Sequence, residues 1–297
     1  MLIILIRKQM SIETPEKYLL NLLGSETKRG GTSLTPPTFH DLSLTEQILS
    51  GGLNINWVYG YNAKALVDKY ILRVPKAEDE RIQMARSIQF EYDSIGASVI
   101  GVGFRLRTIE EQTDFTDLLR KNGFNALQYA AATTEAMLLP FISGVQLSQH
   151  IKDSSDPGSF EVVKDILLHL NSVHKQNITI GDRWCPNTII LPDNRFIEID
   201  FDIELTGDVE STRTFELSQL LYHIVHFADR NRVMAVRSLV GFLHSHPFYL
   251  EIYDLVKLKL LLIGHTNFFA SRNEAYESID PPNSEMYDLI DEIKSYS

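Results

Sequence analysis

The strand-like and helix-like patterns of this chain fall in different parts of it, and this separation limits the folds it can adopt. Four strand-like runs lie in the first half, at 57–59, 70–74, 126–132 and 136–142. The first two predict a β-hairpin with a turn at 60–62. Two helices are predicted between the strand pairs, at 77–95 and 108–121. The pattern after Gly144 is mostly helical, which predicts an α+β fold with a sheet-rich and a helical part.

The clearest helix of the second half begins near Phe160, with Ser159 as its expected N-cap after a breaker run at 154–158. Apolar or aromatic side chains recur there at spacings of three and four, at Phe160, Val163, Leu167, Leu170 and His174. A short hairpin is predicted at 188–191 and 196–199. Further helices are predicted at 146–152, 215–228, 232–244, 248–262 and 284–296.

Composition excludes several classes of protein. The 297 residues contain one cysteine, Cys185, so no internal disulfide forms and a reducing, cytoplasmic location is expected. The net charge of -11 disfavours bulk binding of nucleic acid. The apolar run Met1–Ile6 is far shorter than the roughly 20 residues of a membrane span, and we expect an edge strand or a start before Met10. No membrane partner is expected.

The first part of the chain differs in composition from the remainder. Residues 11–40 are rich in Thr, Ser, Gly and Pro, which predicts a mobile or loosely docked entry segment. We therefore expect three regions: an N-terminal extension at 1–42, a sheet-rich lobe at 43–142 and a helical lobe at 143–297.

One segment carries a recognisable chemical pattern. It runs Ile180-Gly181-Asp182-Arg183-Trp184-Cys185-Pro186-Asn187 and is followed, after the predicted hairpin, by Ile199-Asp200-Phe201-Asp202. Asp182, Asn187 and Asp200 have the spacing of the catalytic Asp, the Asn and the Asp-Phe pair of the protein-kinase-like fold, which this segment resembles.

The resemblance implies a bilobal fold with an antiparallel-sheet N-lobe and a helical C-lobe. It also implies an ATP- and Mg²⁺-dependent phosphotransferase that moves the γ-phosphoryl group to a hydroxyl. Phosphoryl transfer needs a carboxylate to accept the hydroxyl proton and oxygen ligands for Mg²⁺. Asp182 is then the expected base, and Asn187 and Asp200 the expected metal ligands.

Residues upstream would contact the nucleotide. Gly51 and Gly52 resemble the nucleotide-covering loop of aminoglycoside- and choline-kinase-like enzymes, although a plain turn fits nearly as well. The segment 137–144 resembles the last N-lobe strand running into the hinge. Backbone groups of Pro140, Phe141 and Ile142 would meet the adenine there.

The nucleotide-pairing lysine of kinases is missing at its expected place, where Arg73 stands. Arginine keeps the charge and can bind two phosphate oxygens, and Lys76 is a weaker substitute. The acidic partner of Arg73 is expected to be Glu91 or Glu111. We prefer Glu111, because its helix runs directly towards the next strand.

The segment also departs from the kinase pattern. Ile180 stands where kinases commonly have His, and Asp202 where many have Gly. Asp202 would contribute to a second metal or accept backbone hydrogen bonds. Only about a dozen residues separate Asp202 from the helix predicted at 215–228, too few for an activation segment. Between Gly144 and Gly181 there is room for only two helices, too few for the substrate-binding insertions of aminoglycoside and choline kinases. On this measure the chain resembles compact atypical kinases more closely, such as the RIO type and the small kinase of the tRNA-threonylcarbamoylation complex.

The remaining features are open to a structural interpretation. The resemblance covers 51–228, so the last 70 residues match no named family. Their aromatic residues pack the core or line an acceptor pocket: Phe248, Tyr249, Tyr253, Phe268 and Phe269. The pair His223 and His226 lacks the further ligands of a zinc site, and Cys185 is expected to be a small apolar filler.

The sequence supports two functions. The first is a phosphotransferase whose acceptor is a protein, a small metabolite or RNA. The second is a pseudokinase that binds nucleotide or partners without turnover, which the Ile180 and Arg73 replacements favour and the intact Asp182, Asn187 and Asp200 oppose.

Overall fold

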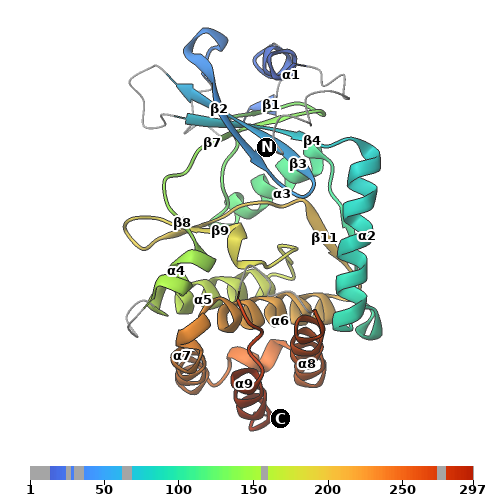
Figure 1. Cartoon of the computed structure of the whole chain (residues 1–297), viewed down its shortest axis with the longest axis vertical. Helices are drawn as coiled ribbons and strands as arrows, with labels where there is room; N and C mark the ends of the chain where they lie inside the picture. Colours follow the sequence, from blue (N-terminus) through green and yellow to red (C-terminus); the bar gives the residue numbers. More distant parts are fainter. Residues whose placement is uncertain are drawn as a thin grey trace. The chain divides into compact units, whose positions relative to one another are not determined.

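The structure is a computed structural model of mixed α+β composition with antiparallel sheets (Figure 1). It describes residues 14–24, 28–29, 37–61, 69–154, 160–272 and 279–296. The chain divides into two compact units, each built from separate stretches. Unit 1 comprises Met1–Arg81, Ile109–Thr113 and Gln128–Phe141. Unit 2 comprises Ile82–Thr108, Asp114–Leu127 and Ile142–Ser297.

Unit 1 is built on a six-stranded sheet in the order β1-β6-β7-β4-β3-β2, with antiparallel neighbours throughout. Its strands are β1 (Lys28–Arg29), β2 (Leu42–Ser50), β3 (Asn54–Tyr61), β4 (Lys69–Pro75), β6 (Ala131–Ala132) and β7 (Met137–Pro140). The predicted hairpin is confirmed, because Tyr59 on β3 lies opposite Tyr70 on β4. Gly60 and Tyr61 of the turn expected at 60–62 belong to strand β3, and residue 62 lies outside the described residues.

Helix α1 (Pro15–Leu22) corrects one prediction, that of a loosely docked segment over 11–40. Its side chains Leu19 and Leu22 are 1% and 0% exposed and belong to the same apolar cluster as Leu72 and Leu138 of the sheet. Tyr18 and Leu23 pack against the same cluster, so the helix docks on the sheet through apolar side chains. The run Met1–Ile6 lies outside the described residues.

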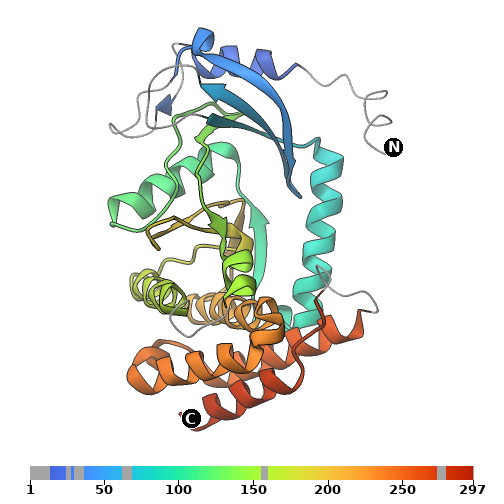
Figure 2. The same cartoon turned by 60° about the vertical axis from the view of Figure 1, so that its left-hand side comes forward.

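Unit 2 is mainly helical. Its helices are α4 (Leu147–Asp153), α5 (Glu161–Lys175), α6 (Val209–Phe227), α7 (Arg232–Ser245), α8 (Leu255–Ser271) and α9 (Ser284–Lys294). Every residue of α6 from Thr214 to Phe227 is buried, as expected of a helix surrounded by others. Helix α8 lies against α6, and the orange-to-red helices α7, α8 and α9 lie together in Figure 2.

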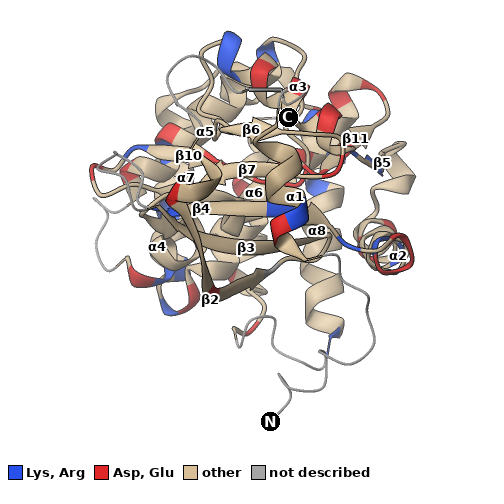
Figure 3. Ribbon diagram, turned by 90° about the horizontal axis from the view of Figure 1, so that it is seen from above, with Lys and Arg blue, Asp and Glu red and all other residues tan. Residues whose placement is uncertain are grey.

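Two helices connect the strands of the first half. Helix α2 (Glu78–Ile95) and helix α3 (Ile109–Lys121) confirm the helices predicted at 77–95 and 108–121. The first turn of α2 is acidic, and Figure 3 shows residues of both charge signs along this helix. Most of α2, from Ile82 onward, belongs to unit 2.

Two predicted helices of the second half have other boundaries, because aspartates cap them. Asp208 accepts a hydrogen bond from the Ser211 amide, so α6 begins at Val209 rather than at 215. The helix predicted at 248–262 is divided, because Asp254 accepts bonds from two backbone amides at the start of α8. A short 3₁₀ turn, η7 (Tyr249–Ile252), precedes it.

Short antiparallel pairs complete unit 2. The hairpin of β9 (Thr188–Ile190) and β10 (Phe196–Glu198) is confirmed, and β8 (Val145–Gln146) extends it. Strand β5 (Gly103–Leu106) pairs with β11 (Ile203–Thr206), which no sequence pattern predicted.

The strand expected over 126–132 is limited to β6, and the strand expected over 136–142 to β7. The expected N-cap Ser159 lies outside the described residues.

Replacing Gly264 by alanine will destabilise the protein, because a Cβ there would lie 1.9 Å from the Ile95 carbonyl oxygen at the end of α2. We expect Gly264→Ala to cost about 1–3 kcal/mol in urea denaturation. Gly241→Ala is the matched control, since a Cβ on that helical glycine meets nothing within 4 Å. It should stabilise by up to about 1 kcal/mol. Two effects of the same sign would contradict this packing.

Unit 2 will lose stability in acid through its buried histidines. Burial lowers the pKa of His265 to about 3 and that of His223 well below its ordinary 6.5. The native state therefore binds fewer protons than the unfolded chain below pH 6.5, and stability falls with pH by about 1.4 kcal/mol per unit for each histidine. His265→Phe, which keeps an aromatic ring against Tyr222, should make this fall shallower in denaturation curves from pH 7 to 5. Parallel curves would contradict the assignment.

Candidate functional site

Three residues singled out by their spacing meet at one end of the β9–β10 hairpin, all within unit 2. The Asn187 side-chain amide donates to the Asp182 carbonyl at 3.2 Å. The Asn187 carbonyl accepts from the Ile199 amide at 2.9 Å, and Ile199 immediately precedes Asp200. The negative charge of Asp200 acts on the Asp182 carboxyl and contributes to raising the pKa of Asp182. The fold thus brings Asp182, Asn187 and Asp200 together.

The Asp182 carboxyl is half-buried and hydrogen-bonded. Its Oδ1 accepts from Gln219 Nε2 at 3.0 Å and from the Tyr92 hydroxyl at 3.3 Å. Burial raises the pKa of Asp182 to about 6, with Asp200 adding to the rise and the two hydrogen bonds opposing it. A carboxylate with a pKa near 6 is mostly ionised at neutral pH and still a competent proton acceptor.

A buried ion pair fastens the Asp182 loop to the hairpin. Arg183 and Glu198 are 2% and 1% exposed, and their side chains form two parallel hydrogen bonds of 2.5 and 3.0 Å. The Thr188 hydroxyl donates a third bond to Glu198 at 2.8 Å. Bidentate geometry of this kind holds both partners in one orientation. The residue that follows Asp182 is therefore tied to the strand that leads to Asp200.

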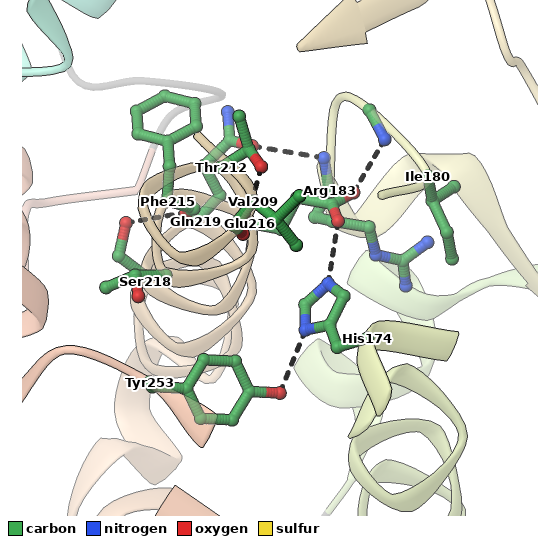
Figure 4. Close-up of polar contacts among 12 residues, drawn as sticks. His174, Ile180, Arg183, Val209, Thr212, Phe215, Glu216, Ser218, Gln219 and Tyr253 are labelled. Carbon is green, nitrogen blue, oxygen red and sulfur yellow. Dashed lines mark hydrogen bonds and ion pairs between the residues drawn. The ribbon is translucent and has the colours of Figure 1, made fainter. Parts of the chain in front are cut away.

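Helix α6 supports the same loop from another side (Figure 4). One carboxylate oxygen of Glu216 accepts from the Gly181 amide at 2.6 Å, and the other lies 2.7 Å from His174 Nε2. His174 Nδ1 lies 2.9 Å from the Tyr253 hydroxyl, so this buried histidine is held from both ring nitrogens. Gln219 Oε1 accepts from the Arg183 amide at 3.2 Å.

Gly181 has no room for a side chain. Its φ of 124° lies in the left-handed region, and a Cβ there would stand 2.1 Å from the Ile203 carbonyl oxygen on β11. The loop before Asp182 can therefore approach β11 closely only because this residue is glycine.

Arg107 is a site residue that the sequence analysis missed. Its Nη1 donates to the carbonyls of Ile203, Phe201 and Ile180 at 2.6, 3.1 and 3.4 Å. Its guanidinium lies 4.0 Å from the centre of the Phe115 ring. Arg107 thereby joins the Asp182 loop to the Asp200 segment, next to the position where kinases commonly have His. No motif marks it, because its partners lie 73 to 96 residues away.

Asp200 has an unusual backbone. Its φ of 66° is left-handed, which is uncommon for a residue with a side chain and recurs at functional sites. Asp202, two residues on, is buried, and its carbonyl accepts from the Arg107 amide at 2.7 Å.

The oxygen atoms of Asp200 and Asn187 are of the kind that bind hard cations, which would need further ligands from another molecule. Across the described residues, no group of three His, Cys, Asp or Glu side chains could hold a metal by itself. The Asp200 carboxylate and the Asn187 amide oxygen are hard ligands, and the Asn187 NH₂ is already engaged with the Asp182 carbonyl. Mg²⁺ commonly takes one or two protein carboxylates and completes its shell with phosphates and water. These two residues therefore supply donor types that Mg²⁺ accepts when other ligands complete its shell.

Glu91 belongs electrostatically to the Asp182 region. Burial raises the pKa of Glu91 to about 7, with the Asp182 charge adding to the rise and Arg272 opposing it. Glu111 stands on α3 within unit 1, as Arg73 does on β4. The pairing of Arg73 with either glutamate stays a prediction.

The expected nucleotide contacts of unit 1 lie on its sheet. Arg73 is buried, and its Nε donates to Asn56 Oδ1 on the neighbouring strand at 3.2 Å. Gly51 and Gly52 form the connection between β2 and β3, where the Gly51 amide donates to the Asn54 carbonyl. Their contact with nucleotide stays a prediction.

The expected hinge follows β7. Pro140 has no amide hydrogen, and the Phe141 amide donates to the Lys69 carbonyl at 3.0 Å. The Lys69 ammonium lies 5.6 Å from the centre of the Phe141 ring. An adenine contact in this segment would therefore use its carbonyls or the Ile142 amide, and it stays a prediction.

The C-terminal aromatic residues mostly pack the core. Tyr249, Tyr253, Phe268 and Phe269 are buried in the main apolar cluster of unit 2, whereas Phe248 is 70% exposed. The remaining candidates are also internal: His223, His226 and Cys185. Burial raises the pKa of the Cys185 thiol, as expected of an unreactive filler.

Comparison with known proteins adds no relative, because no family model and no curated protein matches this chain. Among the described helices, none is long and apolar enough to cross a membrane.

Breaking the buried Arg183–Glu198 ion pair will lower the stability of the protein far more than breaking the exposed Asp193–Arg195 pair. Glu198→Gln leaves the Arg183 charge buried without its counter-ion, and we expect a loss of about 3–5 kcal/mol in denaturation experiments. Asp193→Asn is the matched control, because the Asp193–Arg195 pair is 54% and 76% exposed. It should leave the midpoint nearly unchanged. Similar losses for both variants would contradict the structural role of Arg183–Glu198.

Proposed function

We propose that this protein is an ATP- and Mg²⁺-dependent phosphotransferase of the atypical kinase-like class, which transfers the γ-phosphoryl group to a hydroxyl acceptor. The observation that carries the proposal is the meeting of Asp182, Asn187 and Asp200 at one end of the β9–β10 hairpin. Their spacing resembles the kinase pattern, and their donor atoms suit phosphoryl transfer. The antiparallel sheet of unit 1 and the mainly helical unit 2 are compatible with the α+β class of that fold.

In this proposal Asp182 is the base. As the acceptor oxygen bonds to the γ-phosphorus, the bond from that phosphorus to the β–γ bridging oxygen breaks and ADP leaves. The Asp182 carboxylate takes the proton that the acceptor hydroxyl loses. Asn187 and Asp200 would hold Mg²⁺, which screens the negative charge of the triphosphate.

The site also has features that favour rigidity, which positioning catalysis requires. The Asp182 loop is held by Glu198 through Arg183 and by Glu216 through Gly181. Arg107 binds the carbonyls on both sides of the site. These contacts support turnover, since they supply what the missing histidine at position 180 would otherwise provide.

The second candidate is a nucleotide-binding or scaffolding module without turnover. The observation that favours it is the engagement of Arg73, which stands in place of the phosphate-pairing lysine and donates to Asn56 within its own sheet. The intact set of Asp182, Asn187 and Asp200 favours the enzyme.

ATP with Mg²⁺ should raise the melting temperature of the protein. Saturation at 100 times the dissociation constant corresponds to about 2.7 kcal/mol of stabilisation. Asp200→Ala should remove most of the Mg²⁺-dependent part, and Asp193→Ala, at the exposed turn of the same hairpin, should retain it. An unchanged melting temperature of the unmutated protein would contradict nucleotide binding.

ATP turnover should depend on Asp182. We expect Asp182→Ala to lower the rate at least about 100-fold with retained ATP binding, because base catalysis and orientation are lost together. The assay measures ADP release with panels of protein, metabolite and RNA acceptors. Binding of ATP without Asp182-dependent turnover on any panel would support the scaffolding module instead.

A further inference from the structure

Two buried side chains from different helices converge on one oxygen of Asp182. Gln219 on α6 and Tyr92 on α2 are each 3% exposed. Gln219 Nε2 and the Tyr92 hydroxyl both donate to Asp182 Oδ1, and they lie 3.5 Å from each other. The three polar groups therefore form a closed triangle within unit 2.

Both donors are rigidly placed. The Tyr92 ring packs edge-on against Phe215 and Phe104, with ring centres 4.8 and 5.3 Å away. Gln219 stands on the buried face of α6, and its Oε1 is engaged by the Arg183 amide. Because these side chains are already immobilised, holding the carboxylate costs little further conformational entropy.

The two oxygens of Asp182 consequently have different surroundings. Oδ1 accepts both bonds, whereas no donor among the described residues of unit 2 reaches Oδ2. A carboxylate held through one oxygen has its rotation fixed, and the other oxygen keeps its full capacity to accept a proton.

We propose that Gln219 and Tyr92 are positioning residues that clamp Oδ1 of Asp182 and direct Oδ2 to the acceptor hydroxyl. This inference rests on the proposed phosphotransferase function. It adds Tyr92 of α2 to the reaction centre, a residue to which the kinase-like spacing gives no role. It also gives Gln219 two separable tasks, one towards the Arg183 amide and one towards Asp182.

Three variants separate the clamp from general support of the loop. Tyr92→Phe keeps the packed ring and removes only the hydroxyl. Gln219→Glu keeps an oxygen for the Arg183 amide and loses the donor to Asp182, whereas Gln219→Met loses both. The matched control is Tyr249→Phe, which removes a buried hydroxyl that donates to the Leu167 carbonyl at 3.0 Å.

Steady-state kinetics is the first measurement. We expect kcat to fall about 10-fold in Tyr92→Phe and about 100-fold in both Gln219 variants, with KM for ATP within about 2-fold, because misorientation of a reacting group affects the chemical step. Tyr249→Phe should leave kcat unchanged. If Gln219→Glu retains wild-type kcat, the glutamine serves only the Arg183 amide, and the clamp is refuted.

Crystal structures of the wild type and of the Tyr92→Phe, Gln219→Met double variant provide a readout that needs no turnover. The clamp predicts that the Asp182 carboxylate rotates or takes several rotamers in the double variant. One unchanged rotamer would overturn the clamp even if activity fell. Absence of turnover in the wild type, with the rotamer change present, would overturn the proposed function and leave the clamp standing.

Discussion

The buried pair of Arg183 and Glu198 is the interaction on which the candidate site depends. Two charged groups with almost no solvent contact are stable only when each satisfies the other, and here Thr188 adds a third hydrogen bond. Because Arg183 follows Asp182 directly and Glu198 lies on β10, the pair fixes the Asp182 loop against the β9–β10 hairpin. Strand β10 ends two residues before Asp200, so this one ion pair holds both Asp182 and Asp200 near the same end of the hairpin.

Glu216 and Arg107 also hold that loop. Glu216 on α6 binds the Gly181 amide and is itself held by His174, while Arg107 binds carbonyls on both segments. The bonds from Glu216 and Arg107 engage backbone groups of the loop, so they do not depend on a hydrogen-bonding side chain at position 180. This explains how Ile180 is compatible with an ordered site.

Elements set by interactions between residues close in sequence were predicted, and those set by contacts between distant residues were missed. The β9–β10 hairpin, α2, α3 and α5 were predicted because their apolar spacing is local. The docking of α1 was missed because it depends on contact with the sheet through Leu19 and Leu22. The division before α8 was missed because a single capping residue, Asp254, decides it. The strand pair β5–β11 joins segments about 100 residues apart, which no periodicity in either segment indicates.

The sequence by itself determined which oxygen-bearing residues stand at fixed intervals, since Asp182, Asn187 and Asp200 lie on one short loop and hairpin whose local geometry brings them together. Tertiary structure alone decided what surrounds them. Tyr92 and Gln219 reach Asp182 across 90 and 37 residues of chain, and Arg107 reaches Ile203 across 96. Hydrogen bonds of this kind depend on how helices pack and on what is buried between them, and packing is a property of the whole core rather than of any one segment.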